Sequence, residues 1–296
     1  MATTLTEYGQ PLDPADLLTP ADATELELDP GHPGEHDPGY VARRRDLFKL
    51  CQAHRLGGMP PPWIAYTEEE ERVWQEVAPR LDALHARYAC QLYLKGKKAL
   101  GIRLDRIPQM AEVSQDLQGV TGMHLVPAEG ALPYRTFYRL IANRGFPVTQ
   151  FVRHGSHPEF TPEPDMIHDG LGHVPPLMDA DYAGLLTRIG QAVTASENAE
   201  HVLAFKRFSW FSIEFGLIEE ANEVKVFGAG ILSSVEEIPN SLTSPGVVRR
   251  PFVTEEVIVT DYDPSRMQDR LFIAPSLPFL RQELERLIDQ FGIPVG

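Results

Sequence analysis

The 296-residue sequence has only two cysteines, Cys51 and Cys90, and no long apolar run. Two thiols are too few for a disulfide framework, and they are compatible with a reducing compartment. No segment approaches the roughly 18–20 apolar residues of a membrane span, and the N-terminus lacks the basic and apolar regions of a signal peptide. We therefore expect a cytoplasmic protein that contacts no membrane and buries both cysteines.

Basic charge is also scarce, because 27 Lys and Arg face 42 Asp and Glu, which gives a formal net charge of −15. A chain of this charge repels the phosphate backbone of nucleic acids. The short basic clusters at 43–45 and 95–98 lack interleaved aromatics, and solvated helix ends explain them better. The composition therefore excludes nucleic acid as a favoured partner.

The pattern along the chain is mainly helical after a polar start. Residues 1–40 are rich in Pro, Asp, Glu and Gly, so they bury little apolar surface and are expected to be extended or partly disordered. A second helix begins at the capping pair Thr67 and Glu70. Helices are expected at 40–56, 67–89, 109–122 and 279–291, and β-prone pieces at 123–130, 224–234 and 255–263. One mostly helical domain is the simplest account.

The segment TPEPDMIHDGLGHVPPL, residues 161–177, contains two histidines five positions apart, His168 and His173. A helix turns about 100° per residue, so side chains five apart point about 140° away from each other on a regular helix. The glycines between the histidines, and the prolines after them, predict that the helix frays or ends there. His173 would then swing back toward His168, and the two imidazoles could share a metal.

A third ligand is predicted in FSWFSIEFGLIEE, residues 208–220, where Glu214 sits in an apolar and aromatic run. A buried carboxylate needs a cation or a proton, and a metal held by two imidazoles would supply the cation. Two His and one carboxylate are associated with oxygen-activating non-haem iron, and the same set also holds catalytic zinc. The zinc motif HExxH is absent. Spacing alone leaves iron, zinc and an inert pair of histidines open.

These two motifs, together with VKVFGAGILSS at 224–234, resemble the ligand-bearing motifs of the pterin-dependent aromatic amino acid hydroxylases. The resemblance extends to LDPGHPGEHDPGYVARRRDLF, IAYTEEEERVWQEV and the long stretch from IPQMAEVSQDL to FVRHGS, so it covers about residues 27–280. It implies a mainly α catalytic-domain fold with small β-hairpins, in a single domain at 27–296 after a flexible arm at 1–26. It also implies one Fe(II), tetrahydrobiopterin and O2, used to hydroxylate the ring of a free aromatic amino acid.

The resemblance assigns roles to particular residues, motif by motif. His168, His173 and Glu214 match the iron ligands. The residues that match the pterin site are Phe137, Gly130, Ala131, Leu132 and Asp169. The residues that match the substrate site are Arg153 and Thr161 at the carboxylate, Ser233 near it, and Trp210 at the wall of the ring pocket. Phe211 is expected to help Trp210 limit which ring carbon is presented.

The chain also departs from the family pattern. Ser209 stands where many relatives carry an aromatic before the Trp-Phe pair, which alters the packing beside Glu214. With no regulatory domain before residue 27 and no long tetramerisation helix after Gly296, we expect a monomer or a dimer.

The leading hypothesis is the conversion of L-phenylalanine to L-tyrosine. The bulk of Trp210 favours a single ring over an indole, and an apolar Ile273 at a second wall position would offer nothing to a phenolic hydroxyl. Tryptophan 5-hydroxylation and hydroxylation at another ring carbon are the near alternatives. A zinc hydrolase with a His/His/Glu site and a non-catalytic metal-dependent binding protein are hypotheses from other classes.

Overall fold

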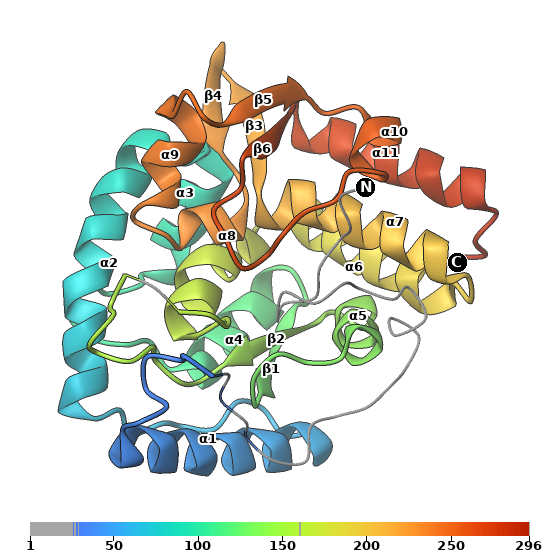
Figure 1. Ribbon diagram of the computed structural model, residues 1–296. Helices are drawn as coiled ribbons and strands as arrows, with labels where there is room; N and C mark the ends of the chain where they lie inside the picture. The colour runs from blue at the N-terminus through green and yellow to red at the C-terminus, as the bar shows by residue number, and fades with distance from the viewer. Residues whose placement is uncertain (1–25, 27, 29, 160, 296) are drawn as a thin grey trace.

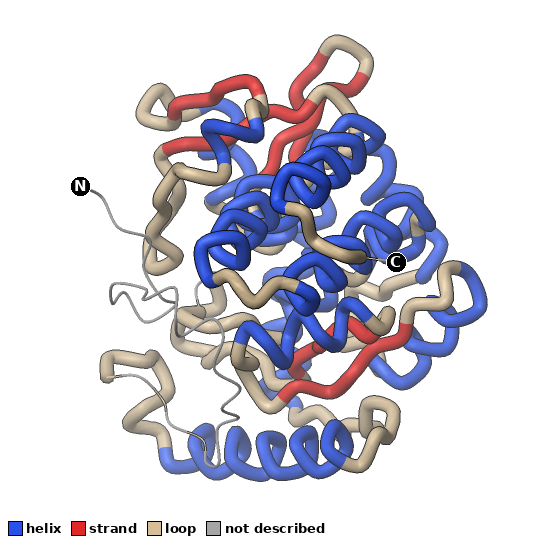
Figure 2. The backbone as a smooth tube through the Cα atoms, turned by 90° about the vertical axis from the view of Figure 1, so that its right-hand side faces the viewer, coloured by secondary structure: helices blue, strands red, loops and turns tan. Residues whose placement is uncertain are grey.

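A computed structural model describes residues 26, 28, 30–159 and 161–295 (Figure 1). The arm expected at 1–26 lies outside the described residues, except for residue 26. Helices surround the middle of the molecule: α1 runs along the bottom of Figure 1, α2 along one side, and α6, α7 and α11 along the other. Figure 2 shows that two small groups of strands lie apart, with helices between them.

Helices make up most of the described chain. Those of the first half are α1 (Pro38–Leu56), α2 (Glu68–Tyr88), α3 (Gln91–Leu100), α4 (Met110–Val120) and α5 (Tyr134–Ala142). Those of the second half are α6 (Ala180–Ala195), α7 (Ala199–Ser209), α8 (Ala229–Leu232), α9 (Glu237–Thr243), α10 (Thr254–Val257) and α11 (Leu277–Phe291). Three short helical turns of other types are η2 (His168–His173), η3 (Pro175–Met178) and η4 (Trp210–Glu214).

The predicted helix at 67–89 is confirmed together with its start signal. Thr67 caps α2 by accepting a hydrogen bond from the Glu70 backbone, while the Glu70 side chain accepts one from the Thr67 backbone. Four acidic residues in the first turn of α2 suit the positive end of the helix dipole. Trp74 and Leu81, on the apolar face of the helix, are completely buried.

The smaller sheet is a parallel pair, β1 (His124–Ala128) and β2 (Gly145–Thr149). Parallel strands need a crossover connection, and α5 supplies it between β1 and β2. Every residue of β2 is buried. The strand thus passes through the core and delivers Thr149 to the middle of the molecule.

The larger sheet has the order β4-β3-β6-β5. Its strands are β3 (Gly216–Glu220), β4 (Glu223–Val226), β5 (Val248–Pro251) and β6 (Arg270–Ala274). Only β3 and β4 form a hairpin among the described strands, since β6 runs parallel to both β3 and β5. The hairpin turns through Ala221 and Asn222, both with positive φ, as a two-residue type I′ turn requires.

Two of the expected strand segments need correction. The piece at 224–234 is a strand only as far as Val226, and α8 follows it. The piece at 255–263 is not a strand, because it begins inside the short helix α10 and then continues as turn and coil. Its alternation of Val257, Val259 and Asp261 looked β-like, but Val257 is buried while Val259 is 67% exposed.

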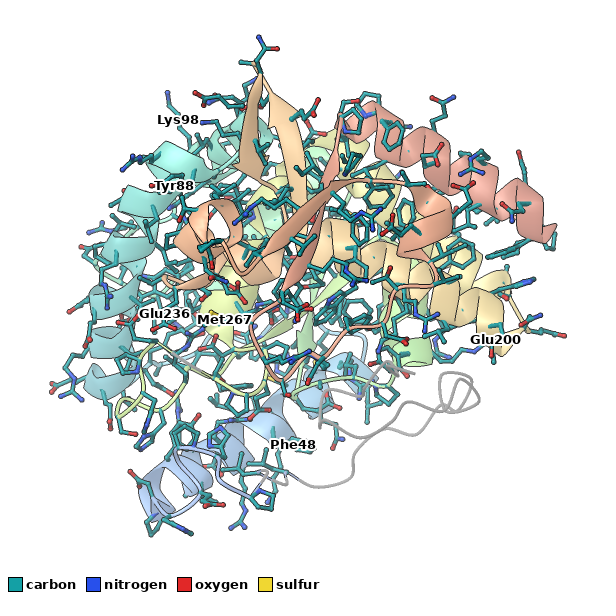
Figure 3. The ribbon with its side chains drawn as sticks, turned by 45° about the horizontal axis from the view of Figure 1, so that its top comes forward. Phe48, Tyr88, Lys98, Glu200, Glu236 and Met267 are labelled. Atoms are coloured by element: carbon teal, nitrogen blue, oxygen red, sulfur yellow. The ribbon has the colours of Figure 1, made fainter. Side chains whose placement is uncertain are left out.

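Most of the buried apolar residues form one continuous core cluster. A small second cluster of Leu47, Ile64 and Phe151 attaches α1. Figure 3 shows side chains filling the space between the helices and the larger sheet. Cys51 and Cys90 are buried and free, as expected, and burial raises the pKa of each thiol to about 12. Among the described residues, no helix combines the length and apolar character of a membrane crossing.

Candidate metal centre and its cavity

The two histidines are brought together by a widened helical turn, so the expected break in the helix is wrong. Residues 168–173 form the π-helical turn η2, in which the Val174 N–H donates to the Asp169 carbonyl five residues earlier, at 3.0 Å. A turn closed by i→i+5 bonds stacks residues five apart on one face. His168 and His173 therefore point the same way while the helix continues.

Glu214 comes from a second turn of the same kind. Residues 210–214 form η4, which ends where the Phe215 N–H donates to the Trp210 carbonyl at 2.7 Å, again five residues earlier. The chain then enters β3. Gly228 lies directly against this turn, and a Cβ at that position would stand 2.3 Å from the Glu214 carbonyl oxygen. Only glycine permits this close approach.

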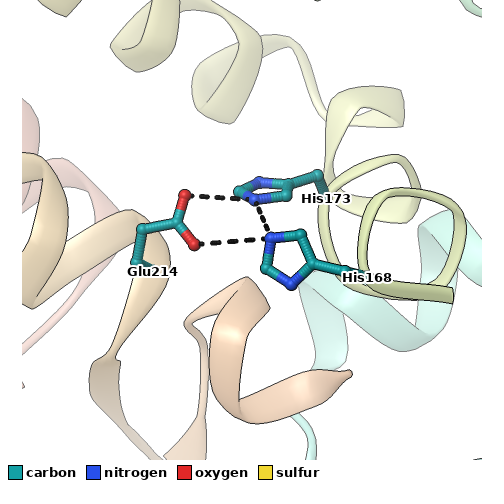
Figure 4. Close-up of side chains that lie close together, drawn as sticks. All are labelled: His168, His173 and Glu214. Atoms are coloured by element: carbon teal, nitrogen blue, oxygen red, sulfur yellow. Dashed lines mark hydrogen bonds and ion pairs between the residues drawn. The ribbon is translucent and has the colours of Figure 1, made fainter. Parts of the chain in front are cut away.

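The three predicted ligands meet at one point (Figure 4). The His168 and His173 Nε2 atoms are 3.1 Å apart, and His173 Nε2 lies 3.1 Å from one Glu214 oxygen. His168 Nε2 lies 3.8 Å from the other oxygen. Ligands bound about 2.1 Å from a metal at right angles stand about 3 Å apart. The donor atoms therefore fit one triangular face of the octahedral coordination sphere of a metal ion.

Ser233 sets the protonation of His168. The Ser233 hydroxyl donates to the Gly230 carbonyl at 3.2 Å and lies 3.0 Å from His168 Nδ1. Since the hydroxyl has a single proton, it accepts from Nδ1–H, which leaves the Nε2 lone pair of a neutral ring facing the site. Burial lowers the pKa of His168 to about 4, and the neighbouring charge of His173 adds to the effect. His168 is thus neutral, as a metal ligand must be.

His173 and Glu214 interact as a pair. Burial lowers the pKa of His173, but the charge of Glu214 and its hydrogen bond outweigh this, so the pKa is raised overall. Burial raises the pKa of Glu214, but the interactions with His173 and His168 lower it overall. The other ring nitrogen of His173, Nδ1, is buried without a hydrogen-bond partner among the described residues. Glu214 is 21% exposed, so it faces a cavity where full burial had been expected.

A cavity of about 360 Å³ opens from the three ligands. All twelve residues that the sequence assigned to the metal, pterin and substrate sites line it. They are Gly130, Ala131, Leu132, Phe137, Arg153, Thr161, His168, Asp169, His173, Trp210, Glu214 and Ser233. The segments that supply them extend from residue 130 to residue 233, so the fold gathers distant parts of the chain around one space.

The family model for biopterin-dependent aromatic amino acid hydroxylases matches residues 15–294. The chain belongs to this family. The chain is 42% identical to phenylalanine 4-monooxygenase of Physcomitrium patens over 212 residues, 72% of this chain and 53% of that protein. It is 38% identical to phenylalanine-4-hydroxylase of Bos taurus over 254 residues, 84% of this chain and 56% of that protein. The chain spans about half the length of these relatives.

Solved structures of the family share the fold of this chain. Chromobacterium violaceum phenylalanine hydroxylase with bound Fe(III) has a TM-score of 0.74 at 28% identity, covering 82% of this chain and 93% of that chain. That protein has also been solved with iron(III) and 7,8-dihydrobiopterin, and with iron and phenylalanine. The expected catalytic-domain fold is thereby confirmed.

Arg153 lines the cavity, but part of its guanidinium is already engaged. Its Nε and Nη2 donate to the two oxygens of Asp165 at 2.9 and 2.8 Å, and Nη1 lies 3.4 Å from the Pro158 carbonyl. Asp165 is fully buried and also accepts from the His168 backbone N–H at 3.0 Å. A guanidinium has five N–H donors, so two remain for a ligand. Asp165, which was not among the residues predicted from the sequence, joins Arg153 to the turn η2.

Asp169 is held by the end of β2. One of its oxygens accepts from both the backbone N–H and the hydroxyl of Thr149, each at 2.7 Å. Burial raises the pKa of Asp169 to about 6, opposed by the charge of His173 and by the Thr149 bonds. Phe137, on α5, makes T-shaped contacts with Tyr138 and Phe146 and lines the cavity. Thr161 bonds the Glu163 carbonyl at 2.9 Å.

Part of the cavity wall is aromatic. Trp210 stacks on Tyr262 with ring centroids 4.0 Å apart and lies 4.6 Å from the ring of Phe215. Lys206 Nζ lies 4.1 Å from the ring centroid of Tyr134 and 5.3 Å from that of Tyr262. Tyr262 and Lys206 were not among the residues predicted from the sequence. A cation four residues before Trp210 in an apolar helix was the available signal for Lys206.

Two expected wall residues are wrong. Ile273 does not line the cavity, because it lies within β6, paired with Leu217 of β3 and with Pro251 of β5. Phe211 is buried in the core against Phe272. Tyr262 takes the place that these residues were expected to fill. Ser209 lines the cavity, and its hydrogen bond to Tyr138 lowers the pKa of that phenol against a larger rise from burial.

Proposed function

We propose that the chain hydroxylates the ring of a free aromatic amino acid, converting L-phenylalanine to L-tyrosine with O2, Fe(II) and tetrahydrobiopterin. The observation that carries the proposal is the triangle of Nε2, Nε2 and carboxylate oxygen at 3.1 to 3.8 Å. Two imidazoles and a carboxylate on one face leave the remaining positions of an iron ion open. The phenylalanine hydroxylases among the relatives, and the bacterial structure with iron and phenylalanine, support the choice of substrate.

His168, His173 and Glu214 would hold the iron, with Ser233 keeping the His168 Nε2 lone pair directed at it. Iron and a tetrahydropterin together would supply an oxygen-binding site and the two electrons that reduce the second oxygen atom to water. The residues Phe137, Asp169 and the loop 130–132 would bind the pterin. Phe137 offers an aromatic face, and Asp169 offers its second oxygen for the N–H groups of the ring.

Arg153 and Thr161 would bind the carboxylate of the amino acid. The two guanidinium donors that Asp165 and Pro158 leave can form a two-pronged contact with a carboxylate. Trp210 would then limit the volume available to the ring. By fixing one end of the substrate and bounding the other, these residues orient the ring toward the metal and exclude water.

The proposal is tested by offering phenylalanine, tyrosine and tryptophan together, with Fe(II), a reduced pterin and O2, and by identifying the products. Tyrosine formed from phenylalanine, in an amount that depends on both iron and pterin, is expected. If most of the product comes from tryptophan, the family chemistry stands but the preferred substrate is tryptophan. Hydrolytic activity with zinc and no pterin would replace the proposal with a zinc hydrolase. Metal binding without turnover of any of the three would indicate a non-catalytic binding protein.

We further propose that residues 27–296 act as one catalytic domain, as a monomer or dimer in the cytoplasm. The continuous core cluster, which reaches from α2 to α11, supports the single domain. Two free, buried cysteines suit a reducing compartment. Sedimentation of the full chain would give the oligomeric state.

A further inference from the structure

A polar cluster, buried except for the 48% exposed side chain of Asp82, lies behind the metal-binding turn, and none of its residues lines the cavity. It consists of Asp82 and His85 on α2 and Tyr93 and Lys97 on α3. His85 and Tyr93 are completely buried, and Lys97 is 8% exposed. By contrast, the next residue, Lys98, is exposed and lies at the outer edge of the molecule (Figure 3). Buried polar side chains are costly unless they are paired, so their partners indicate what they do.

Tyr93 supplies a hydrogen bond that the backbone of the turn cannot make. Its hydroxyl donates to the Leu171 carbonyl at 2.6 Å, between the two histidine ligands. In an α-turn the donor to this carbonyl would be residue 175, and in a π-turn residue 176. Both are prolines, which have no N–H. The Leu171 carbonyl therefore depends on a donor from outside its own helix.

His85 gives a similar hydrogen bond to the segment that carries Ser233. Its Nε2 lies 2.6 Å from the carbonyl of Leu232, the last residue of α8 and the neighbour of Ser233. Lys97 lies 2.9 Å from His85 Nδ1 and 2.8 Å from an oxygen of Asp82. Since the ammonium can only donate, Nδ1 accepts and Nε2 carries the proton that is given to Leu232.

The helix that carries Tyr93 and Lys97 is in direct contact with the prolines. A Cβ on Gly96 would stand 1.9 Å from the Pro175 carbonyl oxygen, so glycine is required for α3 to lie this close. The hydroxyl of Tyr93 reaches Leu171 from this contact. The position of α3 therefore affects the distance between His168 and His173.

We propose that Tyr93, with the Asp82–Lys97–His85 chain beside it, is a positioning device for the metal ligands. Tyr93 holds the π-turn that sets the distance between the two imidazoles. His85 holds the end of α8, from which Ser233 orients His168. The inference rests on the proposed metal centre and deepens it, because these residues touch neither metal nor substrate.

The test compares metal binding by the full chain and two tyrosine variants, with Co(II) as the spectroscopic probe. Tyr93→Phe removes only the hydroxyl that Leu171 needs. Tyr182→Phe is the matched control, because Tyr182 is equally buried and its hydroxyl has no hydrogen-bond partner among the described residues. Titrations are run well below the melting temperature of each metal-free protein, and the Kd and the visible Co(II) spectrum are recorded.

Tyr93→Phe is expected to raise the Kd for Co(II) about tenfold, which is at the lower end of the range for groups that orient metal ligands. The Co(II) absorption bands are expected to shift as well. Tyr182→Phe is expected to change neither. A wild-type Kd and spectrum in Tyr93→Phe overturn the proposal, even if that variant melts at a lower temperature. If Tyr93→Phe does not fold, Lys97→Met decides, with about a threefold rise in Kd expected and a wild-type Kd and spectrum overturning the proposal.

The same titration separates this inference from the proposed function. If wild type does not bind Co(II), or if Glu214→Ala binds it equally well, the metal centre itself is wrong. If wild type binds, Glu214→Ala does not, and Tyr93→Phe behaves as wild type, only the positioning role is wrong.

Discussion

The two sides of the cavity are built in different ways. On the metal side, hydrogen bonds hold the ligands and their neighbours: Ser233 bonds His168, Asp165 bonds its backbone, and Thr149 bonds Asp169. At the aromatic wall, Trp210 and Tyr262 stack on each other, and the Trp210 indole N–H also donates to the Gln268 side chain at 3.3 Å. Hydrogen bonds specify direction, whereas stacked rings mainly fill volume. We therefore expect substitutions on the metal side to affect chemistry and substitutions on the wall to affect substrate preference.

The largest effect is expected from the metal side. Glu214→Ala removes the only anion of the three proposed ligands, so it should abolish hydroxylation and sharply weaken iron binding. Glu214→Gln should retain some geometry but bind metal less well. Iron content after dialysis and turnover measure both effects, with Glu219→Ala as the control because Glu219 is exposed on the following strand. Full iron content and turnover in Glu214→Ala would remove Glu214 from the metal centre.

A smaller effect is expected where the metal side meets the substrate. Arg153→Lys keeps a cation beside the buried Asp165 but loses the planar two-pronged donor. The loss should cost about 1.5–3 kcal/mol of substrate binding, which is a rise in KM of more than tenfold, with iron content unchanged. Arg188→Lys, in an exposed ion pair with Glu285, is the control. An unchanged KM for Arg153→Lys would place this residue outside the substrate site.

Acid pH should destabilise the hydrogen-bonded side of the molecule through His85, an effect that ring stacking does not have. Burial, with the charge of Lys97, lowers the pKa of His85 from 6.5 to about 3, while Asp82 partly opposes the shift and the neutral Tyr93 faces the ring. Between these values the unfolded chain binds a proton that the folded chain does not, so stability falls as the pH drops below about 6.5. At pH 5 the contribution of His85 to the free energy of unfolding is about 2 kcal/mol lower than at neutral pH.

Urea unfolding of the metal-free protein at pH 5 and pH 7 measures this difference. His85→Gln should reduce the loss of unfolding free energy between the two pH values by about 2 kcal/mol. His36→Gln, at a histidine whose side chain is 92% exposed, is the control. An equal loss in His85→Gln and wild type would show that His85 does not titrate in this way.

The smallest effect on chemistry is expected from the wall. Trp210→Phe enlarges the cavity next to Tyr262, so the preference for phenylalanine over tryptophan should narrow by about 1–3 kcal/mol while iron content stays the same. The ratio of kcat/KM for the two substrates measures it. Trp63→Phe, at an exposed tryptophan, is the control. If the ratio does not move, Trp210 is a core residue and the preference is set elsewhere.

How much the sequence could predict depended on how local each feature is. The capping pair Thr67 and Glu70 lies within four residues, so the start of α2 could be predicted in detail. His168 and His173 could be predicted to lie together, but the π-turn that joins them could not, and the Leu171 carbonyl within that turn accepts a hydrogen bond from Tyr93, which is distant in sequence. Ile273 was misplaced because its burial comes from strand pairing with β3 and β5.

The family resemblance predicted more of the candidate site than the spacing of residues did. All twelve assigned residues line one cavity, although spacing alone left iron, zinc and inert histidines open. Asp165 and Tyr262 were missed because their roles depend on partners, Arg153 and Trp210, that meet them only in the folded chain. Pairings of this kind have no signature in local sequence.

We infer that this chain uses O2 to hydroxylate phenylalanine at a metal held by His168, His173 and Glu214. The most direct measurement supplies ¹⁸O₂ with phenylalanine, Fe(II) and tetrahydrobiopterin, and analyses the product by mass spectrometry. We expect tyrosine with one ¹⁸O atom on its ring, one equivalent of pterin oxidised per tyrosine, and no product from Glu214→Ala. Tyrosine without the label, or equal product from Glu214→Ala, would contradict it.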